Sequence, residues 1–340
     1  MSFEIFDRVF CGFFYESGTY CATSGTTLQR FGFVQNHDVT HTVGVIPIRY
    51  AGGGTRDVSV HTQGPIDVEG TLTFFPQDFK SLFLALGSVA DAGSPSPYSH
   101  TIVGVNSDSL GAYTSGTNNP MVSFTVQDTH ETTTAGLHFK RTMSGCIVNS
   151  LTISATEREI VNCELNYVGQ SIVFSSGAAT ALEARSTAGY IRPYLWQDVT
   201  VHIPSGTIIE PVKDFSLSIN NNLAKHHYLN GSRVISSPVP TVRDYEVALT
   251  VNANSTSTKT FFESYFIGAG LADGSEFNMM VSMNASTGSR DAYIVLSGCK
   301  LTDFTAPSNL TNEIQEQTLT IQPKTVTAVV NDELINYGAF

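Results

Sequence analysis

Apolar and polar residues alternate with a period of two along most of this chain. The clearest cases are residues 68–74, 147–153, 215–219 and 245–251, where Ser, Thr or Glu often separates the apolar residues. Such alternation is typical of strands that pack one face on a core and expose the other. The same pattern occurs at 58–62, 122–126, 163–167, 199–203, 279–283, 293–296 and 318–322. The sequence therefore predicts a mainly β protein.

Two short segments follow a helical period instead. In 76–86, apolar residues recur at i, i+3, i+4 and i+7 from Phe79, so they share one face of a helix. Pro76 suits the start of that helix and Gly87 suits its end. A second stripe of aromatic residues predicts another short helix at 257–267.

Segments of the first half recur in the second half in the same order. Residues 67–73 (Asp-Val-Glu-Gly-Thr-Leu-Thr) resemble 244–250 (Asp-Tyr-Glu-Val-Ala-Leu-Thr), and a predicted helix follows each. Farther along, a Ser-Gly-Cys sequence begins both 144–152 and 297–305. A shared order of strand, helix and Ser-Gly-Cys strand predicts an internal duplication.

The repeat divides the chain into two predicted domains, 1–175 and 199–326. Residues 176–198, rich in small side chains, are the expected linker. Residues 88–120 are rich in Gly, Ser, Pro and Asn, which predicts a long surface loop in the first domain. Residues 327–340 are the expected C-terminal arm.

Charge narrows the partners that this chain can bind. It has 18 Lys and Arg against 30 Asp and Glu, a net charge of −12, and only 14% of its residues are charged. Because a net negative surface repels phosphate, the sequence excludes a protein that grips nucleic acid electrostatically. Glu4 and Asp7 stand where a signal peptide would be basic and apolar, and no apolar run reaches the ~20 residues of a membrane span. We therefore expect no export and no membrane partner.

The cysteines and histidines do not form a recognisable metal or disulfide pattern. Five cysteines are an odd number without a Cys-x-x-Cys pair, so we expect reduced, buried thiols. They are Cys11, Cys21, Cys146, Cys163 and Cys299. His37 and His41 lie four apart and His226 and His227 are adjacent, whereas two ligands on one strand face need a spacing of two. Ordinary polar or interface histidines are the favoured interpretation.

Two further features were weighed as catalytic or phosphate-binding sites. Glu157 and Glu159 are spaced to share a strand face, and paired carboxylates perform acid–base chemistry in hydrolases. Two solvated acids on an acidic surface are commoner than a catalytic pair, so this is the favoured interpretation of Glu157 and Glu159. Gly52, Gly53 and Gly54 precede strand-like residues, not the helix N-terminus that a phosphate cradle needs, so a turn or loop is favoured. We predict no catalytic, cofactor-binding or metal-binding residue.

The repeated unit resembles the tail tube domain of tailed bacterial and archaeal viruses, which is also used by contractile injection systems. The likeness is clearest where 215–222 (Phe-Ser-Leu-Ser-Ile-Asn-Asn-Asn) is followed by 228–233 and then by 244–250. The first half has a looser version, with 33–36 leading into 46–54 and then the strand at 67–73. The resemblance covers about residues 30 to 325.

This resemblance implies an architecture and a structural role. Its fold class would be mainly β, with two tandem tail-tube-like β-sandwich or barrel domains that each carry one short α-helix. Such domains form rings of six, so a duplicated chain would form trimeric rings that stack into a conduit for viral DNA. Segments 35–65 and 220–243 would stack one ring on the next. No enzymatic activity and no cofactor are implied.

The resemblance also implies partners and a location. The chain would associate with itself and would meet tape-measure, baseplate and tail terminator proteins, and a sheath in a contractile tail. Double-stranded DNA would pass through the lumen without specific binding, in a virion tail assembled in the host cytoplasm. An alternative is a β-rich surface adhesin or carbohydrate-binding module, which the 13 Tyr and 21 Phe favour and the single Trp, Trp196, disfavours. The hydrolase with Glu157 and Glu159 is a third hypothesis.

Overall fold

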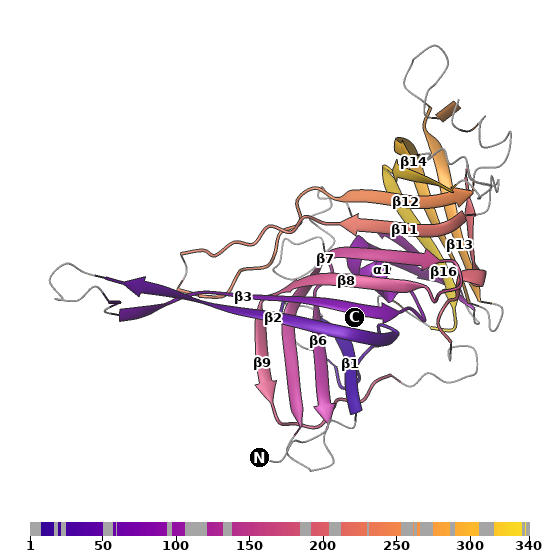
Figure 1. Ribbon diagram of the computed structural model, residues 1–340. Helices are drawn as coiled ribbons and strands as arrows, with labels where there is room; N and C mark the ends of the chain where they lie inside the picture. Colours follow the sequence, from indigo (N-terminus) through magenta and orange to yellow (C-terminus); the bar gives the residue numbers. More distant parts are fainter. Residues whose placement is uncertain are drawn as a thin grey trace.

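Antiparallel strands make up most of the fold, which confirms the mainly β prediction. The computed structural model of the protein describes all residues except 1–7, 17–19, 22–24, 50–56, 59, 94–96, 106–120, 132–137, 184–191, 204–211, 230, 253–260, 262–263, 266–274, 286–289, 306–315, 335–336 and 338–340. Most strands lie where the alternation of apolar and polar residues predicted them. Figure 1 shows a broad body of strands from which one long hairpin projects.

A continuous central sheet of eight strands runs through both halves of the chain. Its strand order is β2 (Phe33–Ile48), β3 (Val60–Phe75), β8 (Asn162–Gly169), β7 (Phe139–Thr156), β11 (Val212–Asn220), β12 (Asp244–Asn252), β15 (Glu316–Gln322) and β14 (Arg290–Thr305). The first four strands come from the first half of the chain and the last four from the second half. The two halves join where β7 pairs with β11.

A second layer of shorter strands covers the apolar face of the central sheet. In the first half, β1 (Arg8–Tyr15) pairs with β6 (Phe124–Glu131), and β6 and β9 (Ser171–Ser175) flank β7. In the second half, β10 (Val199–His202) pairs with β13 (Phe277–Ala285), and β13 and β16 (Thr325–Asp332) flank β14. The order of pairing is therefore the same in both halves.

The Ser-Gly-Cys sequences mark the points where β7 and β14 pass from one layer to the other. Before Gly145, β7 pairs with β9, and after it β7 pairs with β8; β14 changes from β16 to β15 around Gly298. Both glycines have positive φ angles, 67° and 61°, a conformation that glycine adopts at little cost. In each copy the following cysteine thiol lies 3.4 Å from the carbonyl three residues earlier. The shared motif is therefore a bend between the layers.

The hydrophobic core lies between the two layers. Inward positions such as Leu151, Leu217 and Leu249 alternate with polar ones along the central strands and are almost fully buried. Each buried leucine side chain contributes about 1.5–3 kcal/mol to folding. Helix α1 (Lys80–Leu86) is buried along its whole length, and it begins one turn later than the predicted start at Pro76. Of the second predicted helix, 257–267, only three residues are among those described.

Two predicted surface segments are part of the folded body. The prediction of a loop at 88–120 is wrong for its first part, because β4 (Gly87–Ala92) and β5 (Tyr98–Gly104) form a hairpin. This hairpin extends the sheet of the other half, since β5 pairs with β16. The tail predicted at 327–340 begins as a strand of the body, because β16 ends at Asp332 and lies between β14 and β5. Local composition missed the hairpin because an unpaired strand edge elsewhere in the fold recruits these residues.

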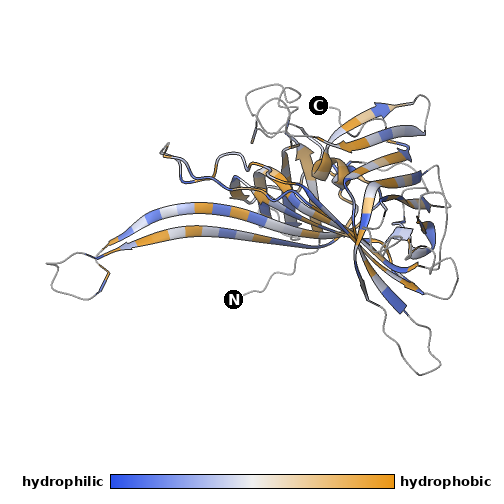
Figure 2. Cartoon of the chain, turned by 90° about the horizontal axis from the view of Figure 1, so that it is seen from above, coloured by the Kyte–Doolittle hydropathy of each residue, from blue (hydrophilic) through white to orange (hydrophobic). Residues whose placement is uncertain are grey.

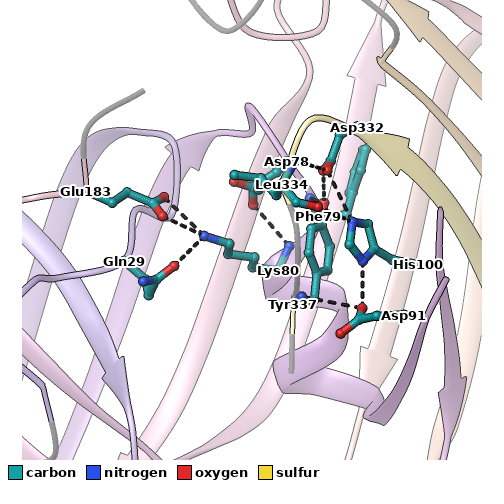
Figure 3. Close-up of polar contacts among 10 residues, drawn as sticks. All are labelled: Gln29, Asp78, Phe79, Lys80, Asp91, His100, Glu183, Asp332, Leu334 and Tyr337. Atoms are coloured by element: carbon teal, nitrogen blue, oxygen red, sulfur yellow. Dashed lines mark hydrogen bonds and ion pairs between the residues drawn. The ribbon is translucent and has the colours of Figure 1, made fainter. Parts of the chain in front are cut away.

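A buried polar cluster fastens the β4–β5 hairpin to the second half of the chain (Figure 3). His100 on β5 is fully buried, and its ring stacks on Tyr337 with centroids 4.0 Å apart. Its Nδ1 lies 2.6 Å from Asp91 Oδ1 and its Nε2 lies 3.2 Å from Asp332 Oδ1. The Tyr337 hydroxyl donates to the other Asp332 oxygen over 2.6 Å. An imidazolium with two carboxylate partners holds the two halves together here.

This cluster predicts that the chain becomes less stable as the pH rises. Burial by itself lowers the pKa of His100, but hydrogen bonds to Asp332 and Asp91 outweigh it and raise the pKa above the usual 6.5. A raised folded pKa stabilises the fold below pH 6.5, and this contribution is lost as the pH passes the folded pKa. We expect the thermal midpoint of the unassembled chain to fall from about pH 6 to about pH 8. His100→Asn should flatten this dependence, and an unchanged pH slope in that variant would contradict the assignment.

Candidate functional site

The histidines weighed as metal ligands serve other purposes. His37 on β2 lies 2.7 Å from Asp128 Oδ2 and 2.7 Å from the Tyr167 hydroxyl, so both of its nitrogens are engaged. His41 is exposed on the same strand, and His227 lies 3.2 Å from Asp67. Within the described part of the chain, no three His, Cys, Asp or Glu residues are grouped to hold a metal ion. His37 and His227 therefore connect strands and segments to one another.

The two acids weighed as a hydrolytic pair lie in an open turn. Glu157 and Glu159 follow the end of β7 and both are exposed, and Glu157 forms an ion pair of 3.3 Å with Arg158. Catalytic carboxylates are usually desolvated in a cleft, which raises their pKa. This turn offers no such environment to Glu159, and the run Gly52, Gly53 and Gly54 lies outside the described residues.

The thiols are unsuited to nucleophilic chemistry. All five cysteines are free, and only Cys21 is not fully buried. Burial raises the pKa of Cys299 to about 11, and it raises the pKa of Cys146 well above the ordinary value. Because the thiolate is the reactive form, burial disfavours nucleophilic chemistry at Cys146 and Cys299.

The most extensive feature is the polar face of the central sheet. Residues opposite each other in the strand pairing share a face, and on this face Ser, Thr, Asn and acidic residues alternate with the buried leucines. Its carboxylates are Asp38, Asp67, Glu69, Glu164, Asp214, Asp244, Glu246, Asp303 and Glu316. Lys300 lies on the same face, opposite Gln322, and Lys213 and Lys225 form ion pairs with Glu316 and Glu69. The face is therefore hydroxyl-rich and acidic.

The central sheet ends in two long strands with unpaired outer edges. On one side is β2, which pairs only with β3 among the described strands, and on the other is the last part of β14, which pairs with β15. Exposed edges of this length are templates for pairing with another chain. The two edges lie at opposite ends of the sheet, so one chain can offer each of them to a different neighbour.

Each free edge has a counterpart in the other half of the chain: β2 corresponds to β11, and β14 corresponds to β7. The two counterparts, β7 and β11, are the strands that pair with each other. Asn220 on β11 and Thr42 on β2 oppose Asp244 and Asp67, the first residues of the repeated Asp-x-Glu strands. On the other side, Ser150 on β7 and Asp303 on β14 each follow a register shift in the pairing with the next strand. Because Ser150 opposes Asn220 within the chain, Asp303 and Thr42 are the corresponding positions on the free edges.

A long hairpin extends beyond the central sheet. We call it the arm, residues 43–48 of β2 and 60–66 of β3, and Figures 1 and 2 show it projecting far from the body. Apolar side chains on the arm are open to solvent: Val45 is 58% exposed, Ile46 53% and Val60 52%. Exposed apolar side chains in such a row mark a protein–protein contact.

The corresponding segment of the second half, 221–243, extends less far and lies against the base of the arm (Figure 1). The Arg233 guanidinium Nε donates to the Gly64 carbonyl over 2.8 Å, and Val234 forms a parallel bridge with Ile66. Lys225 forms an ion pair with Glu69. One chain therefore presents one long arm, and the second segment predicted to stack rings, 220–243, lies at its base.

Comparison with known proteins explains this arrangement of sheet, edges and arm. The model of the phage tail tube protein family matches residues 17–327, nearly the whole chain. The chain belongs to the phage tail tube protein family. No curated protein sequence matches it.

Membership in this family makes the chain a structural component of a virion tail that assembles with its own copies into a tube. A structural family implies a non-enzymatic role for this tail tube protein. Among the described residues, no helix is both long enough and apolar enough to cross a bilayer. The sequence alone did not reveal the free edges of β2 and β14, because alternation within a strand does not show which strands lie side by side. The repeated Asp-x-Glu sequence was the one signal in the sequence that pointed to these edges, because Asp67 and Asp244 oppose Thr42 and Asn220.

Proposed function

We propose that three chains close into a ring in which the central sheets join edge to edge. The observation that carries this proposal is the pairing of β7 with β11, whose counterparts β14 and β2 are the unpaired edges of the same sheet. The junction between two chains then repeats the junction between two halves. With eight central strands in each chain, three chains make a closed barrel of 24 strands. Closure removes both edges.

The internal junction also supports a specific register for the junction between chains. Ser150 opposes Asn220 and Thr152 opposes Ser218 within the chain. At the corresponding positions, Asp303 of one chain would oppose Thr42 of its neighbour, and Thr305 would oppose Thr40. The register brings hydroxyls and one carboxylate together on the polar face.

In this ring each chain contributes two copies of a tube domain. We assign the two copies to 1–175 and 199–326, with 176–198 between them, and β16 (Thr325–Asp332) completes the second copy. The identical order of strand pairing in both halves and the two Ser-Gly-Cys bends support this division. The β4–β5 hairpin and the arm occur in the first copy alone among the described residues, so a ring would carry three of each.

The polar face would line the channel of the ring, through which double-stranded DNA would pass during ejection. The core occupies the other face of the central sheet, so a closed barrel places the hydroxyls and carboxylates inside. A wall with many carboxylates and few cations repels phosphate and offers DNA no lasting contact. DNA would slide through without specific binding.

Growth of the tube would bring the other tail proteins to its ends. Rings would stack through the arm, and the first and last rings would meet baseplate, tape-measure and tail terminator proteins, with a sheath around the tube in a contractile tail. Assembly would take place in the host cytoplasm. The family assignment favours this role over the adhesin or carbohydrate-binding module.

Electron microscopy of the purified protein tests the proposed ring. We expect hollow tubes of stacked rings, with three chains and six similar domains in each ring. Reconstruction at a resolution that separates strands should place the acidic face of the central sheet inside. A protein that stays monomeric at high concentration and in the presence of baseplate would refute the proposal.

A further inference from the structure

We propose that the cleft around Trp196 receives the arm of a second copy of this chain, from the adjacent ring. This inference rests on the proposed tube. It names the surface on which the arm docks, which the family assignment leaves open. The arm supplies the apolar side chains and the cleft supplies a matching apolar wall.

The cleft lies at the junction between the two halves, at the end of the sheet away from the arm. Its volume is about 420 Å³, and its wall includes Trp196, Val199, Val212 and Phe215. It forms where β7 ends and β11 begins, so both halves contribute to it. Each chain has one such junction and one arm, and the two therefore match in number.

Two features of the cleft lack a cover or a partner among the described residues. Trp196, the sole tryptophan, is 44% exposed although it is the largest apolar side chain in the wall. Asn252 also lines the cleft, and its buried Oδ1 has no hydrogen-bond partner among the described residues. Burying an unpaired acceptor is costly, so this part of the wall is unfavourable in the isolated chain. An occupant with apolar side chains would cover the indole.

The arm has the complementary chemistry and the right position. Val45, Ile46 and Ile48 expose their side chains. Arg49, just after β2, is exposed as well. The cleft carries the half-exposed acid Glu157 beside Lys213, which forms an ion pair with Glu316. In Figure 1 the arm projects from one end of the central strands, and β7, β11 and β12 reach the cleft at the other end. Contact between such opposite surfaces is head-to-tail and produces an open filament.

Tryptophan emission provides a direct measurement, because Trp196 is the only tryptophan of the chain. We expect its emission to shift to shorter wavelength as single rings stack into tubes, since the arm would exclude water from the indole. A shift already complete in single rings would assign the occupant to the same ring and overturn the proposal. No shift during tube growth would overturn it too.

Variants separate stacking from ring formation. Trp196→Ala and Ile46→Asp should each form three-chain rings but raise the critical concentration for tubes by at least tenfold. Trp196→Phe should restore stacking in large part. Phe174→Ala is the matched control, because Phe174 on β9 is 51% exposed and lies outside both the arm and the cleft. Normal tubes from both Trp196→Ala and Ile46→Asp would overturn the docking site, whereas a wild-type chain that forms no rings would overturn the proposed function itself.

Discussion

Chains that carry both Thr42→Cys and Asp303→Cys are expected to become covalent trimers when they assemble under mild oxidation. In the proposed register these positions lie opposite each other across the junction between chains, as Asn220 and Ser150 do within one chain. Opposed residues of antiparallel strands have Cα atoms about 4.5–5.5 Å apart, which is within the range that a disulfide spans. Non-reducing electrophoresis should therefore show dimers early and a closed trimer at the end, with little higher material.

Three controls make this result specific. Ser150→Cys with Asn220→Cys should form its disulfide within one chain and leave the mass unchanged. Thr42→Cys alone should give no trimer, because four of the five native cysteines are buried. Thr42→Cys with Thr305→Cys is out of register by two residues and should cross-link poorly. Equal yields from the two double variants would reject the register, and hexamers in place of trimers would reject three chains per ring.

Replacing acids on the polar face by lysines is expected to turn the channel into a DNA-binding surface. Glu164→Lys with Glu246→Lys changes the net charge of each chain from −12 to −8 and places six lysines in a ring of three chains. Both side chains are exposed, so folding and assembly should persist. Tubes of this variant should retain short duplex DNA at low salt. If six phosphates are contacted, affinity should fall by about 10³-fold between about 50 and 200 mM salt.

A charge-matched variant tests whether position matters. Glu131→Lys with Glu333→Lys makes the same change in net charge on the second layer, at the end of β6 and just after β16. Co-sedimentation of DNA with these tubes should stay at the wild-type level. Equal retention by both variants would mean that net charge alone acts. No retention by the Glu164 and Glu246 variant would mean that this face does not line the channel.

The two halves have kept one topology and given it different surfaces. The first half carries the β4–β5 hairpin and the arm, and the second half replaces the arm with the brace at 221–243. In the proposed ring, the shared pairing of strands closes the barrel. The arm, which only the first half carries among the described residues, gives three stacking contacts per ring. In that ring the two halves would pair alike but would not be interchangeable.

The sequence by itself determined most of the strands and the order of the repeated segments. Alternation located the strands because each one packs a face against the core, and that requirement is local. The Ser-Gly-Cys repeat could be detected because a bend that needs positive φ strongly favours glycine at Gly145 and Gly298. The tail tube resemblance followed from the order of these local signals, and the family assignment confirms it.

Only the tertiary structure decided which strands lie side by side. Pairing of β7 with β11, recruitment of β5 by β16, and burial of His100 between two carboxylates all join residues far apart in the chain. Alternation cannot predict such contacts, because it reports which side chains share a face of one strand and not which strand comes next. For the same reason the acidic face, the free edges, the arm with its brace, and the cleft around Trp196 emerged only when the strands were in register.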